Sequence, residues 1–242
     1  MEKTKPLFAA ILWLFWAPSA QAQYTPLINP LTRTTIPQVI QCPGCNKARS
    51  QVPDQPQTPL AEDDGINLSY LRFSFDPALR KSITAQFAKT IGDGDAKSPA
   101  GRYVSSGAAL GDMQRRMTGL GLTANDIGDT FALFLASHWS LARGQATLPP
   151  RHVMQAVKTQ MAAILIAQPT TAELSNAAKQ QQADSMMILA AVSMREIVNA
   201  NKDPKAMATI AASATRLLKG MGFDPAQFEL TTQGIVPVKL EE

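Results

Sequence analysis

The residues with the clearest chemical potential in this chain are two cysteines separated by two residues, Cys42-Pro43-Gly44-Cys45. Such a pair can close a small disulfide ring, exchange electrons with another dithiol, or contribute ligands to a metal ion. In redox enzymes the first cysteine lies at a helix N-terminus, but no strand precedes this motif and no helical pattern follows it. The pattern favours a local disulfide formed by Cys42 and Cys45, with redox activity and metal handling as alternatives.

A second candidate is a pair of carboxylates, Asp126 and Asp129, three residues apart on a predicted helix. That spacing puts them on one face, where they could act as acid and base or bind a cation. Aspartates also suit the first turn of a helix, because the helix dipole is positive there. We therefore predict a structural role for both, with Asn125 or Thr123 as the N-cap residue.

His138, one of two histidines, lies on the apolar stripe of the same predicted helix. A histidine can move protons near neutral pH, so Asp126, Asp129 and His138 together would form the site of an enzyme. The apolar neighbours favour a buried histidine with a satisfied hydrogen bond instead. No His-Glu-x-x-His or Gly-x-Ser-x-Gly motif is present. The sequence thus predicts no catalytic residue and favours a non-enzymatic protein.

Composition argues against several other kinds of site. The formal net charge is +4, and the basic residues form no stripe with interleaved aromatics, so we predict no nucleic-acid partner. The chain has ten methionines, which mostly fall on helical stripes. That placement is typical of core packing rather than of a copper site. We predict no metal and no cofactor.

The first 22 residues have the pattern of a secretory signal peptide. Lys3 and Lys5 form a basic head, an apolar run extends from Leu7 to Trp16, and Ala20-Gln21-Ala22 is a small-x-small cleavage site. The apolar run is shorter than the roughly 20 residues that span a bilayer. We predict cleavage after Ala22, a periplasmic or secreted protein, and no transmembrane anchor after cleavage.

The remaining chain divides into two parts. Residues 23–66 contain seven prolines and little helical periodicity, which predicts a flexible, extended arm that carries the cysteine motif. Residues 67–242 carry repeated helical patterns and predict one helical domain. Its apolar C-terminal tail, with Phe223, Phe228 and Ile235, is expected to fold back onto the helices.

Helix start and stop signals predict the elements that position the candidate residues. Alternating apolar residues predict a short extended segment over Leu71–Phe75. Six helices follow, and their expected limits are Asp76-Pro77 to Ile91, Pro99 or Ala100 to about Thr118, Thr123 or Asn125 to before Gly144, Pro149-Pro150 to before Pro169, Ser175 to Asn199, and Asp203-Pro204 to Gly220 or Gly222.

The predicted fold is all-α: a single globular bundle of about six helices, preceded by the extended segment and the Pro-rich arm. The fifth helix is apolar nearly all round between Met186 and Met194, which predicts a central position for it. The third helix shows one apolar stripe, which comprises Ile127, Phe131, Phe134, His138 and Leu141.

Several segments resemble an uncharacterised family of secreted proteobacterial proteins. The centre of the resemblance is Asn125-Asp126-Ile127-Gly128-Asp129, followed by His138-Trp139 and Gly144. The other matching segments are Leu68 to Pro77, Lys179-Gln180, and Gly220-Met221-Gly222 through Thr231, Gly234 and Pro237. The resemblance covers about residues 67–237 and leaves Cys42 and Cys45 outside. It implies a secreted helical domain of unknown function and supplies no catalytic residues.

Three functional hypotheses follow. The first is a non-enzymatic periplasmic or secreted domain that binds a protein or a cell-envelope component, with the arm reaching toward the partner. The second is a thiol-disulfide or metal-handling protein acting through Cys42 and Cys45. The third is an enzyme with Asp126, Asp129 and His138 in its site.

Overall fold

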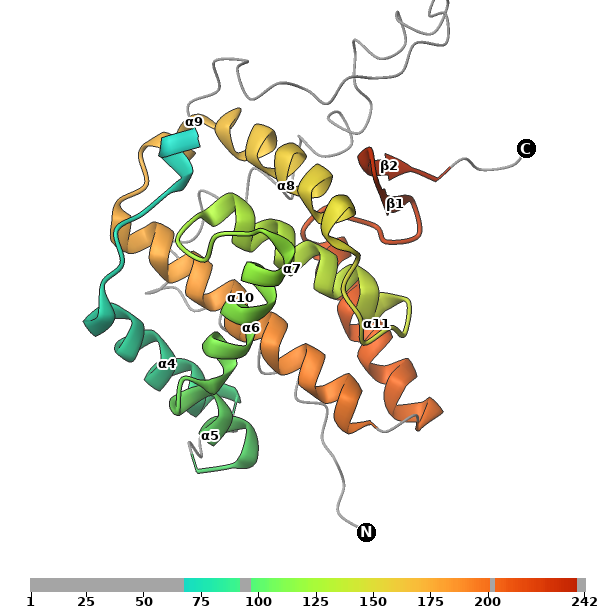
Figure 1. Cartoon of the computed structure of the whole chain (residues 1–242). Helices are drawn as coiled ribbons and strands as arrows, with labels where there is room; N and C mark the ends of the chain where they lie inside the picture. The colour runs from blue at the N-terminus through green and yellow to red at the C-terminus, as the bar shows by residue number, and fades with distance from the viewer. Residues whose placement is uncertain (1–67, 92–96, 201–202, 239–242) are drawn as a thin grey trace, which may run out of the picture.

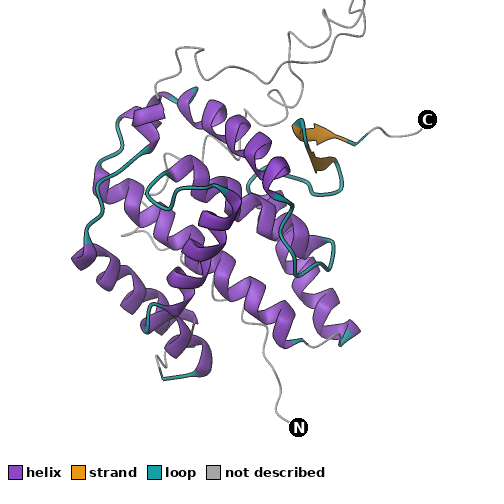
Figure 2. Ribbon diagram, in the orientation of Figure 1, coloured by secondary structure: helices purple, strands orange, loops and turns teal. Residues whose placement is uncertain are grey.

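The computed structural model describes residues 68–91, 97–200 and 203–238. Helices account for most of these residues, and a short hairpin supplies the strands (Figure 2). The predicted all-α fold class is confirmed. The predicted signal peptide (1–22), the Pro-rich arm (23–66) and the Cys42–Cys45 motif all lie outside the described residues.

The elements follow one another with short connections (Figure 1). In chain order they are the 3-10 helix η2 (Leu68–Leu71), α4 (Pro77–Ile91), α5 (Pro99–Ser105), α6 (Ala108–Leu120), α7 (Ile127–Ala142), α8 (Arg151–Ile166), the single turn α9 (Pro169–Ala172), α10 (Asn176–Asn199), α11 (Pro204–Gly220), and strands β1 (Phe228–Thr231) and β2 (Gly234–Pro237). In Figure 1, α4 and α5 lie on the opposite side of the bundle from the hairpin.

Side-chain caps explain why three of the predicted helix starts are confirmed. Asp76 accepts hydrogen bonds from the backbone N–H groups of Ala78 and Leu79 at the start of α4. Ser175 caps α10 by accepting from Ala178, and Asp203 caps α11 before Pro204. Each cap satisfies backbone donors that have no partner within the helix.

The prediction of one helix from Pro99 to about Thr118 is wrong. The chain breaks at Gly107, whose φ of 79° is left-handed, and α5 and α6 lie on either side of the break. Glycine adopts this conformation without the steric penalty of a Cβ atom. The sequence shows the glycine but not the turn, because the apolar stripe continues through it.

The core is built around α7 and α10. The expected central position of α10 is confirmed, since it packs against α4, α6, α7 and α11. Burial of α7 extends well beyond its predicted apolar stripe, because 14 of its 16 residues are buried. Thr130 and Ser137 donate to backbone carbonyls of their own helix, so these polar residues are satisfied inside the core.

The segment between η2 and α4 is extended, as predicted, but it forms only an isolated antiparallel bridge between Arg72 and Asp126. The backbone N–H of Phe73 donates to the carbonyl of Asn125 at 3.1 Å. Leu71, predicted to start the extended segment, instead ends η2. This segment is therefore held against the loop that leads into α7.

The C-terminal tail folds back onto the helices, as predicted, and forms an antiparallel hairpin that the sequence analysis missed. β1 and β2 pair with Leu230 opposite Ile235. Gln160 on α8 bonds to the β2 backbone, because its Oε1 accepts from the N–H of Ile235 at 2.6 Å. On β1, the carbonyl of Phe228 accepts from Trp139 Nε1 at 3.3 Å. The hairpin is thus fastened to α7 and α8.

Candidate functional site

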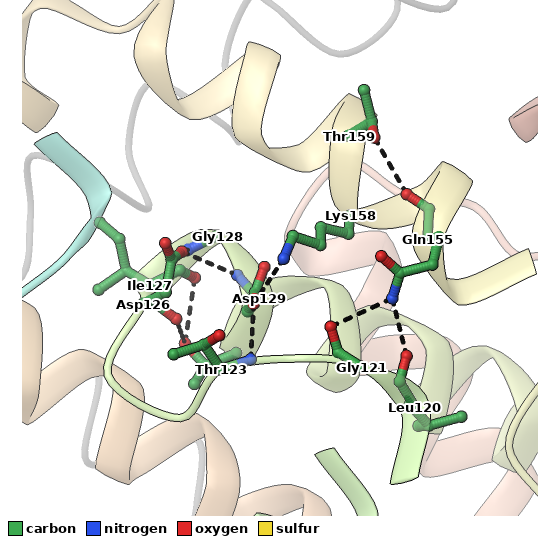
Figure 3. A network of polar contacts seen from close by, with 11 residues as sticks. Leu120, Gly121, Thr123, Asp126, Ile127, Gly128, Asp129, Gln155, Lys158 and Thr159 are labelled. Carbon is green, nitrogen blue, oxygen red and sulfur yellow. Dashed lines mark hydrogen bonds and ion pairs between the residues drawn. The ribbon is translucent and has the colours of Figure 1, made fainter. Parts of the chain in front are cut away.

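Asp126 is the N-cap residue of α7, in place of the predicted Asn125 or Thr123 (Figure 3). Its Oδ1 accepts from the N–H groups of Gly128 at 2.8 Å and of Asp129 at 3.1 Å. The carbonyl of Asn125 instead accepts from the N–H of Phe73 in the extended segment. Burial raises the pKa of Asp126, and the nearby charge of Asp129 adds to the rise.

The buried side chain of Asp129 holds the loop that precedes α7. Its Oδ2 accepts from the N–H of Thr123 at 2.6 Å and from Lys158 Nζ on α8 at 3.0 Å (Figure 3). Its side chain is only 3% exposed. The two aspartates lie close together, as predicted, but they bind different donors. Their observed contacts hold the loop and the helix start in place.

His138 lies far from the carboxylates of Asp126 and Asp129, so the three residues do not form one site. It lies nine residues after Asp129 on α7, which is about 13 Å along a helix axis. Its side chain is fully buried, as predicted, and Nδ1 donates to the carbonyl of Phe134 at 2.9 Å. Nε2 has no hydrogen-bond partner within the described part of the chain, so only one ring nitrogen is satisfied. Burial lowers the pKa of His138 to about 4, which keeps the ring neutral.

A second buried polar network was missed by sequence reasoning. Arg80 on α4 makes two hydrogen bonds to Asp184 on α10, at 3.1 and 2.7 Å, and Asp184 is fully buried. Gln180 bonds the backbone of Asp76 twice, as donor and acceptor, at 2.7 Å each. The sequence signals were the family resemblance at Lys179-Gln180 and at the segment that contains Asp76, because no local spacing connects residues about 100 positions apart.

An open groove of about 320 Å³ lies between α4 and the junction of α5 and α6. Its lining residues are Phe75, Pro77, Arg80, Lys81, Thr84, Ser105, Ser106, Gly107, Leu110, Gly111 and Gln114. The groove owes its shape to the left-handed turn at Gly107, which separates α5 from α6. Its volume lies at the lower end of the range that ligand pockets usually have, about 300 to 1,000 Å³, and it is open to solvent.

Phe75 gives the groove an exposed aromatic edge. Its side chain is 44% exposed. The guanidinium of Arg80 lies over its ring, 4.2 Å from the centroid. Because Asp184 fixes the same guanidinium from the other helix, the aromatic edge and the cation are held together at the groove.

Residues 68–91, 97–200 and 203–238 contain neither a metal-binding cluster nor a membrane-spanning helix. No three His, Cys, Asp or Glu side chains in these ranges gather closely enough to hold a metal ion. No helix in these ranges combines the length and apolar character required to cross a bilayer.

The fold and the groove define an all-α globular domain with an open surface groove. The chain belongs to a family of unknown function (DUF6683), whose model matches residues 2–237. The expected extent of the resemblance, residues 67–237, was therefore too short, and the match includes Cys42 and Cys45. No curated protein and no solved structure matches the chain.

Proposed function

We propose that this protein is a non-enzymatic helical domain that acts in the periplasm or outside the cell and binds a protein or a cell-envelope component. The observation that carries the proposal is the groove between α4 and the α5–α6 junction. It combines an exposed aromatic residue, Phe75, with a cation fixed in place by a buried carboxylate. Exposed aromatic and arginine side chains are the residue types that dominate binding energy at interfaces.

The positions of the candidate catalytic residues favour binding over the enzymatic hypothesis. Asp126 and Asp129 hold backbone N–H groups, and His138 is fully buried and distant from both. A general base must come within hydrogen-bond reach of its substrate. The groove, in contrast, has solvent-exposed residues in its lining, among them Phe75, Lys81, Ser105 and Ser106.

Site-specific photo-cross-linking in cells tests the proposal. A photoreactive residue replaces Ser106 in the groove in one variant and Val198 on α10 in a matched control. Val198 is 62% exposed and lies outside the groove lining. We expect a reproducible partner from position 106 and none from position 198. Equal capture at both positions, or no capture at either, contradicts the proposed function.

The proposed location rests on the pattern of residues 1–22 and has its own test. N-terminal sequencing of the protein purified from the periplasmic fraction or the medium should begin at Gln23. A protein that retains Met1 and stays in the cytoplasmic fraction contradicts the location and leaves the groove as a binding site in another compartment.

The alternative function is thiol-disulfide exchange or metal handling through Cys42 and Cys45. The family match supports keeping this alternative, because it extends over the cysteine motif. A reduction potential below about −300 mV would mark the pair as a structural disulfide, and one between about −120 and −200 mV would favour redox activity. Loss of partner capture in the Cys42→Ser/Cys45→Ser variant would also favour the alternative.

A further inference from the structure

Three arginines gather on the surface where α6 packs against α5 and α10 (Figure 1). They are Arg115 and Arg116 on α6 and Arg195 on α10, and all three are exposed. We call them the arginine patch. We propose that Arg116 and Arg195 of this patch bind a phosphate group. None of the three arginines lines the groove, so the inference goes beyond the proposed function.

Tyr103 on α5 is the residue around which the arginines gather. The guanidinium of Arg195 lies over its ring, 4.2 Å from the centroid. The Tyr103 hydroxyl donates to Asp112 Oδ2 at 2.7 Å, and Arg115 bonds the other oxygen of Asp112. Burial is the main cause of the raised pKa of Tyr103, and the charges of Arg116 and Arg195 both oppose that rise. Side chains from three helices therefore meet near one phenol group.

Two of the three cations lack a carboxylate partner among the described residues. Asp112 forms its ion pair with Arg115, and neither Arg116 nor Arg195 has an ion pair in the described ranges. Glu196 follows Arg195 in the chain, but burial alone raises its pKa to about 7, with no contribution from a neighbouring cation. Like charges that gather near one group repel one another, and a bound anion relieves that repulsion.

The chemistry of the guanidinium group favours phosphate as the anion. Each guanidinium offers N–H donors in a planar fork that matches two oxygens of a phosphate. A tetrahedral phosphate can accept from two such forks, on different helices, through different oxygens, whereas a carboxylate has only two oxygens in one plane. The ring of Tyr103 restricts the Arg195 guanidinium before any ligand arrives, which reduces the entropy lost on binding.

Isothermal titration calorimetry with inorganic pyrophosphate, at low ionic strength, tests the inference on the full protein purified from cells. We expect saturable binding by the wild type. Arg116→Gln and Arg195→Gln should each weaken it about tenfold, because each removes a charge-assisted contact. Arg195→Lys should weaken it about threefold, because lysine keeps the charge but lacks the planar fork.

Arg216→Gln is the matched control. Arg216 is exposed on α11, bonds Ser213 and does not act on Tyr103, so its loss changes net charge alone. It should change the affinity less than about twofold. Equal losses from Arg216→Gln and Arg195→Gln overturn the inference, since they would indicate attraction to overall charge. Absence of saturable binding by the wild type also overturns it. Urea unfolding of each variant checks that the fold is retained.

Two further ligands define the class and the source of the anion. Citrate carries carboxylates and no phosphate, and citrate binding as tight as that of pyrophosphate overturns the assignment to phosphate. Co-sedimentation with phosphatidylglycerol vesicles but not with phosphatidylcholine vesicles, lost in Arg116→Gln and Arg195→Gln, supports the inference with a lipid headgroup as the source. Pyrophosphate binding without co-sedimentation supports it with a soluble phosphate compound as the source.

Discussion

Asp129 and Asp184 are both buried carboxylates paired with a cation from another helix, yet they are held in different ways. Asp129 accepts from Lys158 and from the backbone of Thr123, which lies six residues away. Asp184 accepts two hydrogen bonds from Arg80, which lies 104 residues away on α4. The first network fixes a local loop, and the second joins two distant parts of the chain.

The difference shows how one ion pair can serve both stability and a binding surface. An arginine fork bonded twice to a carboxylate has its position and plane fixed, whereas a lysine contributes a single, more mobile charge. Because Arg80 also lines the groove, the pair that fastens α4 to α10 fixes a proposed binding cation. Lys158 lies outside the groove lining.

The largest effect is expected from Arg80→Ala. The change leaves Asp184 as an unpaired charge at a fully buried site, which should lower the free energy of unfolding by about 4 kcal/mol. Arg115→Ala is the matched control, since it removes an exposed pair in which the Arg115 side chain is 75% exposed, and it should cost at most about 1 kcal/mol. Urea unfolding measures both. Equal losses would show that burial does not distinguish the two pairs.

His138 is a buried titratable group without a charged partner, and it therefore contrasts with the paired carboxylates Asp129 and Asp184. The pKa of His138 is about 4 in the folded protein, below its ordinary value of 6.5, because burial opposes the charged form. As pH falls below 6.5, the unfolded chain binds a proton that the folded protein does not, so stability is lost down to about pH 4. The loss approaches about 3 kcal/mol. Urea unfolding at pH 7 and pH 4.5 should show that His138→Leu removes most of this loss.

Glu196 supplies a control of opposite sign for that experiment. Burial raises its pKa to about 7, from an ordinary value of 4.5. As pH falls from 7 toward 4.5, the folded protein binds the proton first, and stability increases. Glu196→Gln should therefore steepen the acid-induced loss that His138→Leu reduces. Parallel pH profiles for the wild type and both variants would contradict the assignment of these two groups.

Asp129→Ala should lower the free energy of unfolding by about 2 kcal/mol. The change leaves the N–H of Thr123 and the ammonium of Lys158 without their acceptor. The loss should be smaller than that of Arg80→Ala, because no buried charge is left behind and Lys158, whose side chain is 30% exposed, can turn toward water. Thermal unfolding compared with the wild type gives the value, and a loss above that of Arg80→Ala would reverse the ranking.

Lys158→Met should have the smallest effect, about 1 kcal/mol. Asp129 then keeps its bond from Thr123 and the favourable field at the start of α7. Added salt should reduce the difference from the wild type, because the Lys158–Asp129 pair is partly exposed and is screened. A loss as large as that of Asp129→Ala, unaffected by salt, would indicate that the ion pair dominates the network.

The sequence was most informative where a signal and its consequence are neighbours. Asp76, Ser175 and Asp203 mark their helices because a cap acts within three residues of itself. Asp126 was recognised as a first-turn residue but not as the cap, because Thr123, Asn125 and Asp126 all have side chains that can cap a helix. The structure places Asp126 at the cap, whereas the carbonyl of Asn125 bonds the distant residue Phe73.

The candidate site could not be predicted in the same way. Arg80 and Lys81 read as an ordinary basic pair on a helix surface. Only the turn at Gly107 and the packing of α4 beside α5 place them opposite Ser105 and Ser106. A helical stripe predicts which face is buried, but it does not predict which parts of two exposed faces enclose a groove.

The fastening of the C-terminal hairpin has a consequence for behaviour among other chains. A two-stranded sheet has two open edges that can recruit strands from unfolded neighbours and start aggregation. Gln160 lies on the β2 edge at Ile235, and Trp139 lies on the β1 edge at Phe228. These two helix side chains thus bond backbone N–H and carbonyl groups that an incoming strand would need for pairing. A small sheet at the end of the chain can in this way coexist with crowded, unfolded polypeptides without acting as a template for them.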